Sequence, residues 1–151
     1  MSAEENQIIT TTSTAETIAS GESFARRWLT AGAVVLLRGE LGVGKTQFTK
    51  GIARHFGLDE NEIASPTYSL VNEYEVHTHG VEKLFHLDCY RFEKPEELLE
   101  LGVEEYLLPR KDITIIEWPE RIEAYLPSKR IEVRFEVLSP TQRIITIEVK
   151  H

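Results

Sequence analysis

The chain has 151 residues, 41% hydrophobic and 28% charged, which suits one soluble globular domain and leaves too little chain for two full cores. Seventeen basic and 25 acidic residues give a net charge of −8, which disfavours unaided binding to nucleic acid or anionic lipid. A single cysteine excludes an internal disulfide, no apolar run is long enough to cross a bilayer, and the polar start shows no signal peptide. We expect one cytoplasmic domain over residues 1–151, without membrane association.

The first part of the chain alternates strand-like and helix-like patterns. Residues 1–12 are typical of a short strand or a loose arm. A helix is expected over about 14–30, because a Ser and a Glu with capping-box spacing precede hydrophobic residues at helical intervals. The apolar run 33–37 is typical of a strand buried on both faces of a parallel sheet. A second amphipathic helix is expected after it, with Gly57 as its C-cap.

The middle of the chain adds two short buried strands. Residues 65–76 are rich in Thr, Tyr and Val, which indicates a loop that leads into a strand. The runs 84–88 and 113–117 are short, mostly apolar and end in a carboxylate. Between these runs, residues 95–108 form an acidic amphipathic pattern, typical of one helix or of a pair of helices broken at Gly102.

The last third predicts a short helix over 119–126 and then an antiparallel hairpin, with alternating hydrophobic residues over 131–137 and 144–149. Strands that alternate with helical patterns are typical of βαβ units. We therefore predict a three-layer α/β fold with a mixed, mostly parallel central sheet and a C-terminal antiparallel β extension.

The strongest motif is GELGVGKT, residues 39–46, a full match to G-x-x-x-x-G-K-[ST] between a buried strand and an amphipathic helix. Its glycines let backbone N–H groups converge on phosphate oxygens at a helix N-terminus. Lys45 would reach the β- and γ-phosphates, and the Thr46 hydroxyl would ligate Mg²⁺. The motif predicts a P-loop NTPase-like fold and a phosphate site made by Glu40, Leu41, Gly42, Val43, Gly44, Lys45 and Thr46. The D-x-x-G and N-K-x-D motifs of GTPases do not follow, so adenine is favoured by elimination.

Two carboxylates end the strands that would lie beside this loop. Asp88 ends the run 84–88 and Glu117 ends the run 113–117. Carboxyl ends of parallel strands meet at the edge of the sheet that holds the phosphate loop. One carboxylate would hold Mg²⁺ with Thr46 and the other would orient the attacking water, and the sequence does not separate these roles. Lys45, Asp88 and Glu117 are therefore the predicted catalytic residues.

Two other residues each have two interpretations, and a third has only a structural one. Thr67, in the run Ser65-Pro66-Thr67, would sense the γ-phosphate as switch loops do, or belong to a proline turn. Trp118, after Glu117, is either a core residue or an aromatic that faces a partner. Cys89 is expected to be a small packed residue rather than a nucleophile.

Four blocks together resemble the bacterial TsaE family, the ATPase of the tRNA threonylcarbamoyladenosine modification system: GELGVGKT, SPTYSLVNEYE, FHLDCYRF and ITIIEWPE, in that order. The resemblance runs from about residue 17 to residue 120 and more weakly to the final strands. The family loop usually reads GDLGAGKT, where this chain has Glu40 and Val43.

The resemblance implies Mg²⁺-dependent ATP hydrolysis, with Thr46 and Glu117 at the metal and with Asp88 and Thr67 in two switch-like segments. It implies adenine contacts near Thr12, Ser13 and Thr14 and from Arg143. It also implies two partner proteins, the transferase subunit and its dimerising partner (TsaD and TsaB type). In that arrangement this chain contacts tRNA only indirectly, through the complex. ATP hydrolysis resets the complex between catalytic cycles.

Two other functions compete with the ATPase. A small-molecule kinase would carry an arginine-rich lid between its later strands, whereas residues 92–108 are acidic. A binding module would use ATP to regulate assembly with negligible turnover, so partners would change its affinity rather than its rate.

Overall fold

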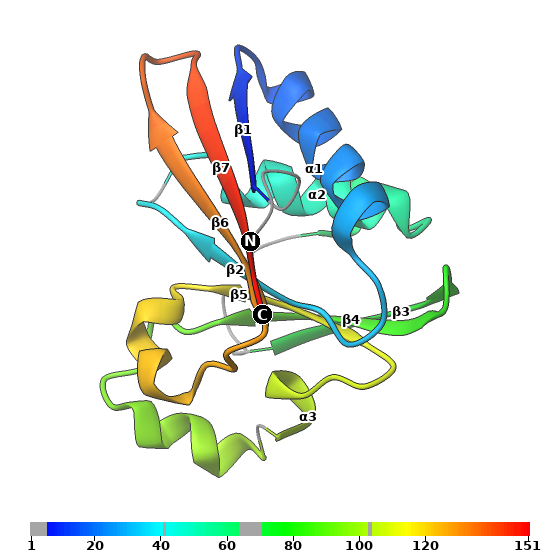
Figure 1. Cartoon of the computed structure of the whole chain (residues 1–151), viewed down its shortest axis with the longest axis vertical. Helices are drawn as coiled ribbons and strands as arrows, with labels where there is room; N and C mark the ends of the chain where they lie inside the picture. Colours follow the sequence, from blue (N-terminus) through cyan, green and yellow to red (C-terminus); the bar gives the residue numbers. More distant parts are fainter. Residues whose placement is uncertain (1–5, 41, 64–70, 103) are drawn as a thin grey trace.

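The computed structural model describes residues 6–40, 42–63, 71–102 and 104–151. Within these residues a seven-stranded sheet has the order β1-β7-β6-β2-β5-β4-β3 (Figure 1). Strands β6, β2, β5 and β4 run parallel, and β1, β7 and β3 pair antiparallel with their neighbours. The strands are β1 (Asn6–Thr11), β2 (Val34–Arg38), β3 (Val71–Thr78), β4 (Val81–Asp88), β5 (Ile113–Glu117), β6 (Arg130–Val137) and β7 (Arg143–Lys150).

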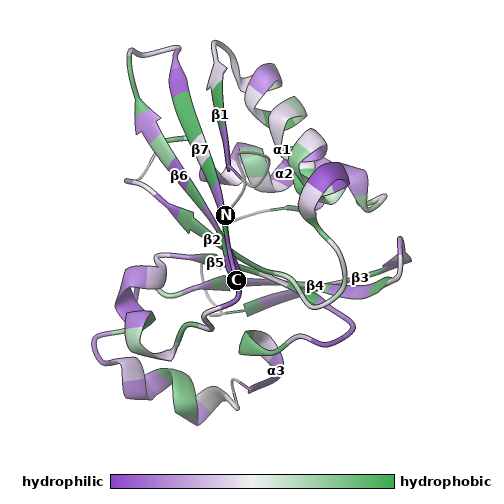
Figure 2. Ribbon diagram, in the orientation of Figure 1, coloured by the Kyte–Doolittle hydropathy of each residue, from purple (hydrophilic) through white to green (hydrophobic). Residues whose placement is uncertain are grey.

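The helices cover both faces of this sheet and give the predicted three-layer α/β fold (Figure 1). The α-helices are α1 (Thr14–Trp28), α2 (Lys45–His55) and α3 (Glu104–Leu107), and the 3-10 helices are η2 (Glu60–Glu62), η3 (Pro95–Leu101) and η4 (Pro119–Tyr125). The central strands are largely hydrophobic in Figure 2, whereas α1 mixes hydrophobic and hydrophilic residues along its length. This is the pattern expected when strands are buried on both faces and helices on one.

Helices α1 and α2 pack on one face of the sheet and approach each other through two glycines. A Cβ at Gly51 would lie 1.9 Å from the Ile18 backbone oxygen, and one at Gly21 would lie 2.1 Å from that of Phe48. The close approach buries Phe24 against Phe48, whose ring centroids are 5.2 Å apart. It fixes α1 against α2, the helix that directly follows the phosphate loop.

The opposite face has a thinner cover than the sequence predicted. The pattern over 95–108 forms the 3-10 helix η3 and the single turn α3, and the expected helix over 119–126 is the 3-10 helix η4. Both η3 and η4 start at a proline, and Gly102 ends η3 with a φ of 71°, so the predicted break there is confirmed. Each of these two segments is short and buries a hydrophobic side chain against the sheet, Leu98 from η3 and Ile122 from η4.

The C-terminal hairpin is antiparallel, as predicted, and it also continues the central sheet. Strand β6 pairs with β7 on one side and runs parallel to β2 on the other. Strand β1 then pairs with β7, which makes the N-terminal segment a strand rather than a loose arm. The hairpin thereby brings the turn between β6 and β7 to the same edge of the sheet as the phosphate loop.

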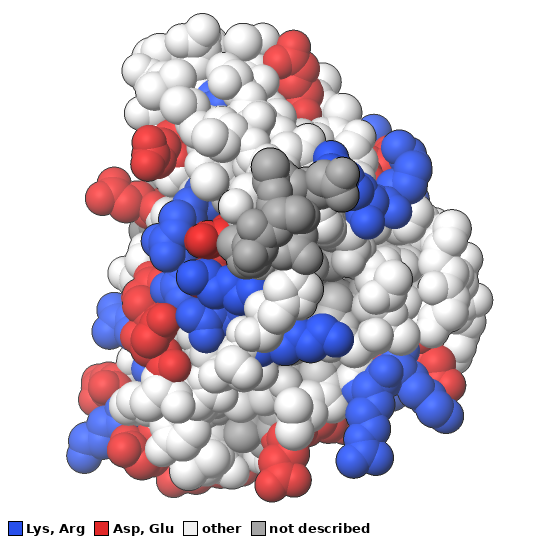
Figure 3. Space-filling view, in the orientation of Figure 1, with Lys and Arg blue, Asp and Glu red and all other residues white. Residues whose placement is uncertain are grey.

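A charged cluster lies where β2 meets β6. Glu132 is 2% exposed and accepts a hydrogen bond from Arg38, and it forms ion pairs with Arg130, Arg134 and Lys150. Burial alone would raise the pKa of Glu132, but the hydrogen bond and charge of Arg38, with the other cations, lower it below the ordinary value. Basic side chains also gather left of centre in Figure 3, with acidic ones beside them.

Candidate nucleotide site

The phosphate loop joins β2 to α2 with its glycines in conformations that other residues rarely adopt. Gly42 and Gly44 have φ values of 78° and 102°, and a Cβ at Gly39 would lie 2.9 Å from the Val43 side chain. Gly44 is the N-cap of α2 and, as a glycine, supplies no side-chain capping hydrogen bond. Backbone N–H groups at an uncapped helix start are suited to binding a phosphate. Leu41 lies outside the described residues.

Lys45 is held at this loop by two contacts. Its Nζ donates a hydrogen bond to the Gly39 backbone oxygen at 2.7 Å and lies 4.1 Å from the centroid of the Trp118 ring. Burial lowers the pKa of Lys45, and the negative charge of Glu117 is the strongest opposing influence. The lysine is therefore ordered beside the phosphate loop.

The two predicted carboxylates are neighbours on adjacent parallel strands, because Asp88 of β4 is in register with Glu117 of β5. Glu117 is 4% exposed, and its Oε2 lies 2.6 Å from Nε2 of the buried His86. Asp88 is half-buried, and its Oδ1 accepts a hydrogen bond from the Tyr90 backbone N–H at 2.9 Å. Burial raises the pKa of Asp88, and the nearby charge of Glu117 raises it further.

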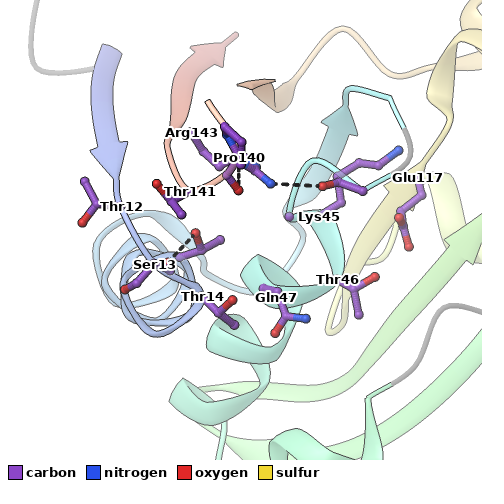
Figure 4. Close-up of a pocket in the computed structure, with 13 residues that line it drawn as sticks. Thr12, Ser13, Thr14, Lys45, Thr46, Gln47, Glu117, Pro140, Thr141 and Arg143 are labelled. Atoms are coloured by element: carbon purple, nitrogen blue, oxygen red, sulfur yellow. Dashed lines mark hydrogen bonds between the residues drawn. The ribbon is translucent and has the colours of Figure 1, made fainter. Parts of the chain in front are cut away.

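A cavity of about 550 Å³ joins the phosphate loop and Lys45 to Glu117 (Figure 4). One wall is the start of α1, a second is the phosphate loop with the start of α2, and a third is the turn between β6 and β7. Arg143 reaches from that turn to the Gly42 backbone oxygen at 3.5 Å, and it also donates to the Ser139 oxygen at 2.9 Å. The cavity is lined by Thr12, Ser13, Thr14, Thr17, Gly42, Gly44, Lys45, Thr46, Gln47, Glu117, Pro140, Thr141 and Arg143.

Most of the predicted site residues meet in this cavity. Nine of them line it: Thr12, Ser13, Thr14, Gly42, Gly44, Lys45, Thr46, Glu117 and Arg143. Glu40 is exposed and Val43 is buried in the core beside α2, so their side chains lie away from it. Asp88 stands next to Glu117 but does not line the cavity. Thr67 lies outside the described residues.

Several site residues were not predicted from the sequence. His86 precedes Asp88 by two positions, and side chains two apart in a strand share a face, so this spacing was an available signal. Thr17, Gln47, Pro140 and Thr141 have no such signal, because their place depends on how α1, α2 and the hairpin pack together. Trp118, which had two interpretations, lies half-buried over Lys45 and beside Tyr90.

The donor set fits a Mg²⁺ ion that is bound together with nucleotide phosphates. Among the described residues, no group of three or more His, Cys, Asp or Glu side chains is placed to hold a metal ion. Mg²⁺ in nucleotide sites is usually bound by one or two protein oxygens plus phosphates and water. The Thr46 hydroxyl and the Glu117 carboxylate line the same cavity and are oxygen ligands of this kind. Over the described ranges, no helix has the length and apolar character needed to cross a membrane.

A G-x-x-x-x-G-K-[ST] loop between β2 and α2 of a parallel α/β sheet defines a P-loop NTPase-like protein. The family model described as "Threonylcarbamoyl adenosine biosynthesis protein TsaE" matches residues 11–145. The chain belongs to the TsaE family, as the sequence blocks predicted.

Individual relatives agree with this assignment. A Rickettsia bellii protein, "tRNA threonylcarbamoyladenosine biosynthesis protein TsaE", is 40% identical over 114 residues, 76% of this chain and 76% of its own. The Treponema pallidum protein of the same name is 38% identical over 121 residues, 80% of this chain and 85% of its own. The crystal structure of Bacillus subtilis YdiB superposes with a TM-score of 0.76 at 28% identity, over 97% of this chain and 86% of that one. This similarity confirms the predicted fold class.

Proposed function

We propose that this chain is a Mg²⁺-dependent ATPase that acts in the threonylcarbamoyladenosine modification of tRNA. One observation carries the proposal: a single cavity contains the phosphate-loop residues Lys45 and Thr46 and the buried strand-end carboxylate of Glu117. Phosphoryl transfer to water needs these parts, which are a cation for the phosphates, oxygen ligands for Mg²⁺ and a carboxylate near the attacking water. Membership of the TsaE family supports the link to tRNA modification.

We assign each side chain a task that its position supports. The N–H groups at the start of α2 and the Lys45 ammonium would bind the β- and γ-phosphates. Thr46 and Glu117 would hold Mg²⁺, which when bound neutralises charge between the two phosphates. Asp88, whose pKa is raised by burial, would orient the attacking water and accept its hydrogen bond.

The rest of the cavity suits the nucleoside. The walls of the cavity outside the phosphate loop include Thr12, Ser13 and Thr14 at the start of α1 and Arg143 from the hairpin (Figure 4). We assign adenine contacts to these four residues, as the family resemblance implied. The sensing role of Thr67 remains a prediction from the sequence.

The energy of hydrolysis would be used outside this chain. We propose that the nucleotide state changes affinity for a transferase subunit and its dimerising partner, of the TsaD and TsaB type, so that hydrolysis resets the complex between cycles. The net charge of −8 supports an indirect contact with tRNA, in which the partners bind the RNA phosphates.

The test is ATP hydrolysis by the purified chain, alone and with these two partners, with Glu117→Ala as the control variant. We expect the partners to stimulate phosphate release, and we expect Glu117→Ala to bind ATP and to release no phosphate. Bound ATP without hydrolysis in any mixture would instead identify a regulatory binding module. Transfer of the γ-phosphate to a small acceptor would identify a kinase. A Glu117→Ala variant with the normal rate would remove Glu117 from the mechanism.

A further inference from the structure

His86 has no role in the ATPase proposed above, yet it contacts the most buried carboxylate of the site. It lies on β4, in register with Ile115 of β5, while Asp88 is in register with Glu117. Registered partners on neighbouring strands share a face of the sheet, so His86, Asp88 and Glu117 project toward the side covered by α1 and α2. His86 is 1% exposed, and its Nε2 lies 2.6 Å from Glu117 Oε2.

The direction of this hydrogen bond follows from the groups around it. A carboxylate offers only acceptors, so the Nε2 of His86 carries the hydrogen and donates it to Glu117. The Nδ1 atom is buried and has no hydrogen-bond partner among the described residues. Among the described residues, the hydrogen bond to Glu117 is therefore the one polar contact of the His86 ring.

Glu117 and Lys45 line the same cavity with opposite charges, yet they do not pair. Lys45 instead donates to the Gly39 oxygen and lies over the ring of Trp118. In the described part of the chain, no ion pair joins Lys45 to a carboxylate, whereas the hydrogen bond from His86 engages Glu117. A direct pair would occupy the ammonium that the nucleotide phosphates need.

We infer that His86 is a positioning residue that keeps the Glu117 carboxylate apart from Lys45, so that the lysine stays available to phosphate and the carboxylate to the metal ion. This inference rests on the proposed function of the site. Without the His86 donor, the buried carboxylate has lost its hydrogen bond, and Glu117 is the carboxylate with the largest charge effect on Lys45. The two side chains would then pair, and nucleotide binding would have to break the pair.

The test uses four variants of the full chain: His86→Leu, His86→Gln, Glu117→Gln and the double variant His86→Leu/Glu117→Gln. Calorimetric titration with ADP in the absence of Mg²⁺ measures the affinity of the phosphate site without catalysis. ATP hydrolysis with the partners measures turnover, and thermal unfolding of each variant checks that it is folded. Gln is the matched control because its amide places an N–H near the position of the His86 Nε2.

We expect His86→Leu to weaken ADP binding on the order of tenfold and to lower kcat by at least as much, because the buried carboxylate loses a charge-assisted hydrogen bond. His86→Gln should recover most of both quantities. The double variant should bind ADP as well as Glu117→Gln alone, because a neutral amide does not attract Lys45, while its turnover stays lost.

Two results would overturn the inference. One is a double variant that binds ADP as weakly as His86→Leu, because His86 would then support the site only through packing. The other is a His86→Leu variant that binds ADP and hydrolyses ATP like the wild type. Absence of hydrolysis by the wild type would count against the proposed ATPase instead, and the ADP titrations would still decide the role of His86.

Discussion

Lys45 is ordered by neutral neighbours, the Gly39 oxygen and the Trp118 ring, which release it without breaking an ion pair. We expect Lys45→Ala to lower nucleotide affinity about 100-fold or more, since a charged contact to phosphate in a partly buried site is worth a few kcal/mol. Calorimetric titration with ADP measures this loss. Lys50→Ala, on the same helix and outside the cavity, should bind as the wild type does. A Lys45→Ala variant with unchanged affinity would refute the phosphate site.

Glu132 gives the fold a dependence on pH. Its pKa is below the ordinary value of 4.5, so the stability from its cation cluster is present above that value and is lost as the pH falls through the lower folded-state pKa. We expect Glu132→Gln to lower the free energy of unfolding at neutral pH by about 3 kcal/mol and to flatten the acid side of the profile. Urea unfolding at a series of pH values measures both effects.

The matched control for this variant lies on the same strand. Glu136 is exposed on β6, so Glu136→Gln should leave the stability within about 0.5 kcal/mol of the wild type. Equal pH profiles for the wild type and Glu132→Gln would show that the buried cluster contributes nothing to the acid dependence.

At the residue scale, the sequence identified the side chains whose chemistry is local. Gly42, Gly44 and Lys45 are part of a contiguous motif, and Glu117 ends a short apolar run, so each has a signal within a few positions. The spacing of His86 and Asp88 predicts that they share a strand face, but the contact of His86 with Glu117 also needs the register of β4 on β5, which that spacing does not specify.

At the scale of elements, the contact between α1 and α2 depends on having no side chain at Gly51. An alanine in a helix interior usually stabilises a protein relative to glycine by about 1 kcal/mol. Here the added Cβ would lie 1.9 Å from the Ile18 oxygen, so we expect Gly51→Ala to destabilise the protein by about 3 kcal/mol instead. The sign of the change in urea unfolding tests the packing, and Lys50→Ala in the same helix should be nearly neutral.

The elements also show which structural features are determined locally. The strand runs 33–37, 84–88 and 113–117 were found because they are short and apolar, and β2, β4 and β5 overlap them. The acidic pattern over 95–108 predicts one helix or a pair broken at Gly102, but it does not specify the helix type. Hydrophobic residues three apart suit a 3-10 helix as well, and packing on the sheet distinguishes the two. The parallel pairing of β6 with β2 joins segments too distant in sequence for any local pattern to predict.

At the scale of the whole molecule, the single cysteine reports on opening of the fold. Cys89 is fully buried, and burial raises the pKa of its thiol to about 12, so at neutral pH it reacts with a thiol reagent only after the surrounding structure opens. A nucleotide that binds only the folded chain should slow labelling about 100-fold at a concentration of 100 Kd if opening is global. Labelling kinetics with and without ADP measure this protection, which Lys45→Ala should lack. Rapid labelling of the free protein would contradict the burial.

The order of the strands has a consequence for synthesis on the ribosome. Strand β1 is made first, but its neighbour in the described sheet is β7, which is made last. Two walls of the cavity, Thr12 to Thr14 beside β1 and Arg143 at the start of β7, are therefore joined only when the final strand has left the exit tunnel. A nascent chain that ends before Arg143 has the phosphate loop but lacks one wall of this cavity. Pairing between segments so far apart in sequence folds slowly, so the cavity is completed after the phosphate loop and the central strands have formed.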